Sequence, residues 1–314
     1  MRPRHQAFLP SFAYAVLAFG AAVSALVGPG PCRAADRENT WGGNARVERF
    51  HTSDLFPGAG EPRPDWGLRA SLKAEAGFPV GSRLRILEWA KLVAERYDVW
   101  SPRDLEQWSL GTDFRGQGYR FRIYGELTKG ELAFPAANSD GAILDRSALG
   151  SDLRVDLGPG WRADLKAEYE RQNYVPSYDE RDGNRWTLRT GVERNLTRGR
   201  SLGLFHEYRR ARSVTQLFSF EQNSLRGVVD WPLPLGVSGE LELQLGLRNY
   251  RTGQSFATNF GRSDHRSVLS GTLERGLAGP LRAHLFGSWK HRTSTRASKD
   301  YDVSTVGIAL SANR

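Results

Sequence analysis

The chain has 314 residues, of which 39% are hydrophobic and 25% are charged, and its formal net charge is +9. This composition excludes a bundle of membrane-spanning helices, each of which needs about 20 consecutive apolar residues. The basic residues alternate with acidic ones instead of forming a patch, so we expect no nucleic-acid partner. A single cysteine, Cys32, excludes a disulfide scaffold.

The first 35 residues predict a secretory signal peptide. Arg2 and Arg4 precede an apolar stretch at residues 7–27, and small residues follow at Ala34 and Ala35. An uncleaved membrane anchor is the alternative, because the apolar stretch is long for a signal. We therefore expect residues 1–35 to be a signal peptide and residues 36–314 to form one folded domain.

Beyond residue 35, apolar and polar residues alternate with a period of two, which is typical of β-strands with two unlike faces. In residues 161–170 one face holds Trp161, Ala163, Leu165, Ala167 and Tyr169, and the other holds Arg162, Asp164, Lys166, Glu168 and Glu170. The pattern predicts about 14 strands, within a range of 12–16. These lie at residues 44–52, 65–76, 82–98, 105–115, 118–128, 146–157, 160–173, 184–196, 200–212, 218–231, 236–251, 264–275, 280–292 and 300–312.

Two of these segments leave alternatives open. Residues 82–98 also fit an amphipathic helix through Ile86 and Val93, although a helix there would break the alternation of turns described next. In residues 202–210, Phe205 shares a face with Glu207 and Arg209. The orientation of that strand is therefore undecided, and a β-bulge is one explanation.

The connections between the strands alternate between two classes. Short turns, such as residues 158–160 and 197–199, alternate with longer polar segments, such as residues 174–183 and 250–263. Short periplasmic turns and long extracellular loops are typical of bacterial outer-membrane barrels, whose even strand number puts both termini in the periplasm. In these features the chain resembles the outer-membrane β-barrel proteins of Gram-negative bacteria, a porin-like class, without a motif for one family.

The end of the chain matches part of the β-signal with which such barrels commonly close. Thr305, Gly307 and Leu310 fit the expected polar, glycine and apolar positions. Ala312 and Arg314 stand where an aromatic close is usual. This departure leaves the recognition of the chain by the assembly machinery as a question for experiment.

The resemblance implies an all-β fold, a single closed antiparallel transmembrane barrel in the outer membrane, surrounded by outer-membrane lipid and lipopolysaccharide. One face of each strand then meets lipid and the other lines the lumen. Trp161, Tyr169 and Trp289 are expected in the aromatic belts at the membrane interfaces. The side chains expected to line the lumen are Arg120, Arg122, Glu126, Asp152, Arg154, Arg162, Asp164, Lys166, Glu168, Glu170, Arg185, Arg189, Glu240, Glu242, Arg248, Arg282 and Lys290.

A lumen of this kind suggests a channel for the passage or export of a polar solute, with an oligosaccharide or polysaccharide as one candidate. Because the lining charges have both signs, we expect no strong ion selectivity. The alternative hypothesis is a plugged barrel, closed by ion pairs, that serves as a membrane anchor or as a scaffold for a periplasmic partner protein.

A minor alternative is a lipid hydrolase. His265 and Ser267 share a strand face with Leu269 and Leu273, which is similar to the outer-membrane lipid A deacylases, where histidine is the base and serine the nucleophile. Val268 departs from that family, which has a polar residue there. We otherwise expect no enzyme or cofactor, because the sequence contains no phosphate loop, nucleophile elbow or HExxH motif. We also expect no metal site, because Arg181 in the acidic loop falls where a calcium loop needs an oxygen ligand.

Overall fold

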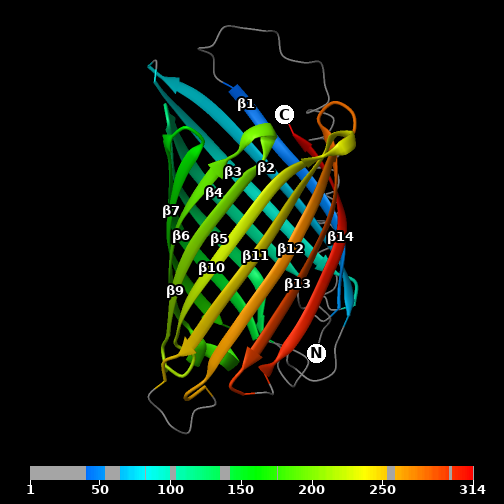
Figure 1. Cartoon of the computed structure of the whole chain (residues 1–314). Helices are drawn as coiled ribbons and strands as arrows, with labels where there is room; N and C mark the ends of the chain where they lie inside the picture. The colour runs from blue at the N-terminus through cyan, green and yellow to red at the C-terminus, as the bar shows by residue number, and fades with distance from the viewer. Residues whose placement is uncertain are drawn as a thin grey trace, which may run out of the picture.

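The computed structural model describes residues 40–53, 64–81, 83–99, 104–134, 142–174, 176–252, 259–296 and 299–313. The expected signal peptide at residues 1–35 lies outside them. In the described part of the chain, fourteen antiparallel strands form one closed barrel, as the sequence predicts (Figure 1). No helix in that part is long and apolar enough to cross a membrane.

The strands follow one another around the barrel in chain order. They are β1 (Thr40–Thr52), β2 (Asp65–Val80), β3 (Leu84–Tyr97), β4 (Leu105–Gly116), β5 (Tyr119–Phe134), β6 (Ala142–Gly158), β7 (Trp161–Tyr174), β8 (Gly183–Asn195), β9 (Ser201–Ser213), β10 (Phe220–Leu233), β11 (Val237–Tyr250), β12 (Ser263–Gly276), β13 (Leu281–Ser294) and β14 (Tyr301–Asn313). The segment for which a helix was the alternative is the strand β3.

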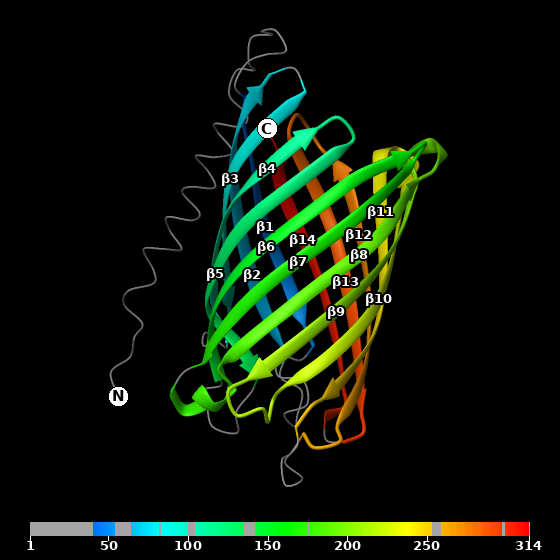
Figure 2. The ribbon, with the colours of Figure 1, turned by 90° about the vertical axis from the view of Figure 1, so that its left-hand side faces the viewer.

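The barrel closes where β1 pairs with β14, in a register that places Asn44 opposite Asn313 and Thr52 opposite Thr305. The two ends of the barrel differ (Figures 1 and 2). At the turn end, where β1 begins and β14 ends, short connections join the strands, including the short helices η3 (Thr197–Gly199) and η4 (Pro234–Gly236). The loop end carries the other connections, including η2 (Pro176–Arg181).

The outer surface is apolar in the middle of the barrel. In the middle of β11 every second residue is a leucine, and Leu241, Leu243, Leu245 and Leu247 are 43%, 46%, 49% and 38% exposed. A soluble protein would bury such a row against a core, because large exposed apolar patches are unfavourable in water. An acyl-chain environment removes that cost, and the closed sheet leaves no backbone edge in lipid.

Glycines on the inner face make room for aromatic rings from neighbouring strands. The Tyr124 ring covers Gly150, and the Phe205 ring covers Gly191, so that a Cβ atom at either glycine would overlap the ring. These glycines lie opposite their aromatic partners in the strand register. The rings therefore pack flat against the inner wall instead of extending across the lumen.

The structure resolves the orientation of β9. Its pairing with β8 and β10 runs without a register shift, so β9 contains no bulge. Phe205 faces the interior together with Glu207 and Arg209, while Leu202 and Leu204 are exposed on the outer surface. Register shifts occur elsewhere, between β5 and β6 near Thr128 and between β6 and β7 near Asp156.

Candidate functional site

The candidate site is the inner surface of the barrel. The predicted lining side chains all alternate with outward-facing residues and lie on the inner face, on strands β5–β8, β11 and β13. They do not form one uniform lining. The inward side chains of β4–β8, called the paired wall, differ in kind from those of β12, β13, β14 and β1, called the recess wall.

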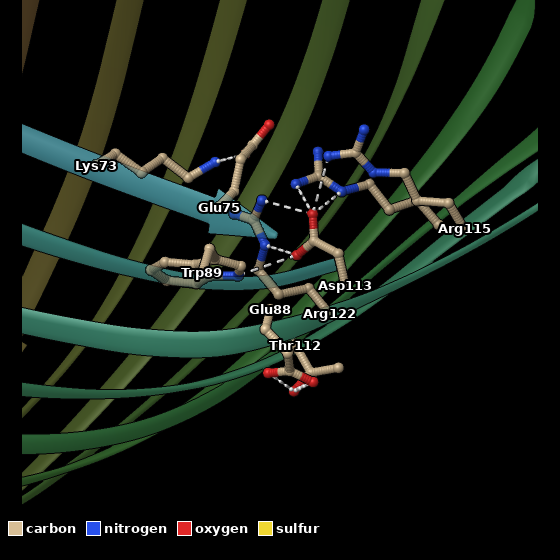
Figure 3. Close-up of polar contacts among 9 residues, drawn as sticks. Lys73, Glu75, Glu88, Trp89, Thr112, Asp113, Arg115 and Arg122 are labelled. Atoms are coloured by element: carbon tan, nitrogen blue, oxygen red, sulfur yellow. Dashed lines mark hydrogen bonds and ion pairs between the residues drawn. The ribbon is translucent and has the colours of Figure 1, made fainter. Parts of the chain in front are cut away.

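Asp113 on β4 is the centre of the first ion-pair cluster of the paired wall (Figure 3). Its carboxylate is 1% exposed and accepts hydrogen bonds from Arg122 Nε at 2.5 Å and Arg120 Nε at 2.9 Å. Arg115 Nη2 lies 3.2 Å away, and Trp89 donates its indole N–H at 3.2 Å. A carboxylate this buried needs several donors, because its desolvation would otherwise be costly.

Glu170 on β7 repeats the arrangement three strands further around the barrel. Its carboxylate is also 1% exposed. It accepts hydrogen bonds from Arg185 Nη2 at 2.5 Å, from Arg146 Nη1 at 3.3 Å and from the Gln172 amide at 2.5 Å. Arg146 also forms an ion pair with Glu126, with 2.8 Å between Nη2 and Oε1. One arginine thus joins carboxylates from β5 and β7, which holds three neighbouring strands in register.

Further ion pairs lie on the paired wall, including that of Arg162 with Glu193. Arg154 Nη2 lies 3.1 Å from Asp164 Oδ1, and Lys166 Nζ lies 2.9 Å from Glu168 Oε2. The Tyr124 hydroxyl also donates to Glu168, at 2.5 Å. Most of the long charged side chains of this wall are therefore occupied with one another.

In its middle part the recess wall carries small and hydroxyl-bearing residues between longer charged ones. It encloses most of a cavity of about 490 Å³ whose lining includes the hydroxyls of Thr52, Ser270, Thr272, Ser288 and Thr305. Four aromatic rings also line it, from Phe50, Tyr97, Phe286 and Tyr301. Its charged lining consists of Arg46, Arg69 and Lys290 and of Glu48, which lies 2.6 Å from Arg46 and 3.1 Å from Arg69. We call this cavity the middle recess.

A second cavity of about 370 Å³, called the turn-end recess, lies nearer the turn end. Arg46 and Thr272 line both cavities, so the two recesses adjoin along one side of the lumen. The turn-end recess is mainly acidic, because Asp230, Glu240 and Glu274 line it, and His284 lines it as well.

Sequence reasoning missed the aromatic residues of the interior. Phe50 and Tyr97 face inward, although apolar side chains were assigned to the lipid face, and Phe205, whose orientation the sequence left undecided, faces inward as well. The Phe205 ring has arginines on both sides, with Arg226 at 4.7 Å and Arg189 at 5.6 Å from its centroid. A glycine directly opposite an aromatic residue on the neighbouring strand, such as Gly191 opposite Phe205, indicates an inward ring, but this pairing can be identified only when the strand register is known.

The predicted belt residues lie on the outer surface. Trp161 and Trp289 are each 43% exposed and Tyr169 is 36% exposed. The Tyr169 ring packs against Trp186 of β8, with 4.7 Å between their centroids. Trp161 begins β7 at the turn end, whereas the other two lie toward the loop end, so both edges of the apolar band carry aromatic rings.

His265 and Ser267 face outward, and in the part of the chain that the structure describes neither forms a hydrogen bond or an ion pair. Acid partners occur instead at two other histidines of β13: His291 Nδ1 lies 2.8 Å from Asp302, and His284 Nδ1 lies 3.5 Å from Glu274. His291 stands opposite Ser267 in the register but stacks on Trp289. A nucleophile needs a hydrogen bond to its base, and the geometry provides none.

No metal site is formed by the described ranges, which contain no suitable group of three or more His, Cys, Asp or Glu side chains. In the acidic loop, Arg181 lies over the Phe218 ring at 3.6 Å. Asp182 accepts the backbone N–H of Tyr174 at 2.6 Å. The loop is thus fixed by contacts within the protein.

No family model matches the sequence, and no curated protein matches it. Solved structures do match. OmpT (in-vitro folded), an outer membrane protein of Vibrio cholerae, is 8% identical with a TM-score of 0.51, over 91% of this chain and 100% of that chain. The anion-selective porin from Comamonas acidovorans is 11% identical with a TM-score of 0.48, over 88% and 99%. The outer membrane channel DcaP of Acinetobacter baumannii is 10% identical with a TM-score of 0.48, over 90% and 99%.

At these identities the likeness is one of fold. The closed barrel of 14 strands has the architecture of the Gram-negative outer-membrane β-barrel proteins. Its exposed leucines and aromatic edges agree with that architecture, because each matches a layer of the bilayer. The protein is an outer-membrane β-barrel.

Proposed function

We propose that the protein is an outer-membrane channel through which a polar solute passes along the recess wall. The observation that carries this proposal is the pair of adjoining recesses, which share Arg46 and Thr272 and follow one side of the lumen toward the turn end. A barrel of about 14 strands is larger than the eight-stranded barrels that side chains fill. The short side chains of the recess wall leave that extra width unfilled.

The solute class that the middle recess fits best is a saccharide. Sugars present many hydroxyls and an apolar ring face, and the recess offers hydroxyls from Ser270 and Ser288 beside the rings of Phe50 and Phe286. A site of this kind binds through a few directed hydrogen bonds on an apolar support. The lining hydroxyls both donate and accept, which suits a sugar hydroxyl in either role.

The paired wall favours a second candidate, in which the barrel is a closed scaffold that anchors a partner protein. Asp113 and Glu170 each hold two or more arginines, and these clusters brace the interior. Buried ion pairs contribute little net stability but can fix one arrangement of side chains. A scaffold would use that rigidity and would not conduct.

Reconstitution of the purified full-length protein in a planar bilayer tests the two candidates. Discrete and reproducible single-channel openings in potassium chloride are the expected result, and a neutral oligosaccharide such as maltohexaose should reduce the current in a concentration-dependent way. A silent bilayer, with a barrel that keeps its folded migration on an unheated gel, would contradict the channel and favour the scaffold.

A further inference from the structure

A cluster of arginines lies on the inner face at the loop end of β11–β13. Arg262, Arg266 and Arg292 converge on a single oxygen of Asp264, with guanidinium nitrogens at 2.8, 4.0 and 4.0 Å from Oδ2. Asp264 is fully buried. Arg248 of β11 stands opposite Asp264 in the strand register and faces the same side. We call these four residues the arginine cluster.

Asp264 is already satisfied by one member of the cluster. Arg262 donates to both carboxylate oxygens at 2.8 Å, through Nε and Nη2, which is the bidentate geometry of a strong ion pair. The other two contacts to Asp264 are at 4.0 Å, beyond hydrogen-bond distance. The positive charges of Arg266 and Arg292 are therefore only weakly neutralised.

Two members of the cluster are held by neutral groups. Arg248 donates Nε to the Gln222 amide oxygen at 2.9 Å and stacks over Phe220, 3.8 Å from the ring centroid. Arg292 donates Nε to the Lys299 carbonyl at 2.7 Å and lies 4.2 Å from the Tyr301 centroid. These contacts orient the guanidinium groups without cancelling their charge.

Arg266 is the least satisfied member. Its Nε is buried and has no hydrogen-bond partner, while its side chain as a whole is 26% exposed. A guanidinium in this state can still donate to an incoming acceptor. In the described chain, the four cations of the cluster have ion pairs with one carboxylate only, so the cluster carries an excess of three positive charges.

The cluster adjoins the middle recess. Tyr301, on which Arg292 stacks, lines that recess, and so does Lys290, two residues before Arg292 on the same face of β13. We propose that the arginine cluster is a binding site for an oxyanion, a carboxylate or phosphate group, at the loop end of the lumen. This inference rests on the proposed channel function, and it implies that the solute carries such a group, as an acidic saccharide does.

The chemistry of the cluster fits this ligand. Planar guanidinium groups donate paired hydrogen bonds to carboxylate and phosphate oxygens, and they lose little water in doing so. Several of them around one position attract an anion more strongly than a single charge would, because the low-dielectric wall strengthens each interaction. The charges that line the whole lumen have both signs, but at the arginine cluster positive charge exceeds negative charge.

The test is equilibrium binding of two probes, inorganic phosphate and glucuronate, to the detergent-solubilised full-length protein by calorimetry at low ionic strength, with glucose as the neutral control. The key variant is Arg266→Gln, because Asp264 keeps its bidentate partner Arg262 and the fold is preserved. The matched control is Arg275→Gln on the same strand, whose exposed outward side chain lies at the turn end. Both variants lose one positive charge.

We expect Arg266→Gln to weaken anion binding by about tenfold, the loss of one charged hydrogen bond, and Arg275→Gln to leave it unchanged. Binding of both probes supports an acidic saccharide, and binding of phosphate alone assigns the site to free phosphate. Equal affinities of the two variants, or no binding of either probe to the wild type, would overturn the proposal. A silent bilayer with intact anion binding contradicts the channel and leaves the site standing.

Discussion

The two walls of the lumen solve the same structural problem with opposite means. On the paired wall, long charged side chains fill the interior and form ion pairs, such as Arg122 with Asp113 and Arg185 with Glu170. On the recess wall, short residues such as Ser288 and Thr305 leave a cavity open. The difference teaches that a charged inner face need not be the face that meets a solute, because its charges can already be occupied.

The largest test of this contrast is Asp113→Asn. The change removes the only carboxylate that the described residues place within ion-pair distance of Arg120 and Arg122, and it should lower the free energy of unfolding by about 3 kcal/mol. Denaturant unfolding followed by tryptophan fluorescence measures it. Asp152→Asn is the matched control, since the described chain gives Asp152 no ion pair; it should cost less than about 0.5 kcal/mol. Equal losses would show that the ion pairs of this wall carry no stability.

Filling the middle recess tests the other wall. Ser288→Trp places an indole ring in the cavity and should reduce the single-channel conductance by roughly half, because the open cross-section controls the current. The recording uses the same bilayer as the wild type. Ser147→Trp adds the same ring to the outer face of β6 and should leave the conductance unchanged. An unchanged current through Ser288→Trp would mean that ions do not follow the recess wall.

A third prediction concerns the packing of aromatic rings on the paired wall. Gly150→Val introduces a side chain that overlaps the Tyr124 ring and should displace its hydroxyl from Glu168. We expect a loss of about 1–3 kcal/mol in unfolding free energy, as for other overpacked sites. Gly227→Val is the control, because a Cβ there meets no atom within 4 Å, and it should not destabilise the barrel. Similar losses in both variants would contradict the role of Gly150.

The smallest effect is expected outside both walls. Arg49 hydrogen-bonds Asp98 in the loop after β3, at 2.9 Å, which holds the pKa of Asp98 below its usual value. A lowered pKa means that the pair stabilises the fold above the ordinary aspartate pKa of about 4, and that this contribution is lost as the pH falls through the lower folded value. Asp98→Asn should therefore narrow the difference in melting temperature between pH 7 and pH 3. A difference equal to that of the wild type would show that the pair contributes nothing.

The fold could be predicted from the sequence because its strongest signals are local. Alternating leucines such as Leu243 and Leu245 and the two classes of connection each lie within a few residues, so they identify strands, faces and barrel order without knowledge of the pairing. The side-chain orientation on β11 follows from the same pattern.

The details of the candidate site could not be predicted, because they depend on register between strands. Asp264 meets Arg292 only when β12 and β13 are aligned, and the Phe205 ring lies against the inner wall in the space that Gly191 on β8 leaves free. The sign of the charge at one position is likewise a property of several strands together. A count of acids and bases over the whole lumen averages this difference away.

The pairing of β1 with β14 has a consequence for how the protein is made. Of the fourteen strand pairings it joins the two most distant parts of the chain, so it can form only after β14 has been synthesised. Until it forms, two strand edges expose unpaired backbone groups that lipid cannot satisfy and that other chains could pair with. Biogenesis must therefore protect both edges until the seam closes, and a chain that stops before β14 should be degraded instead of inserted.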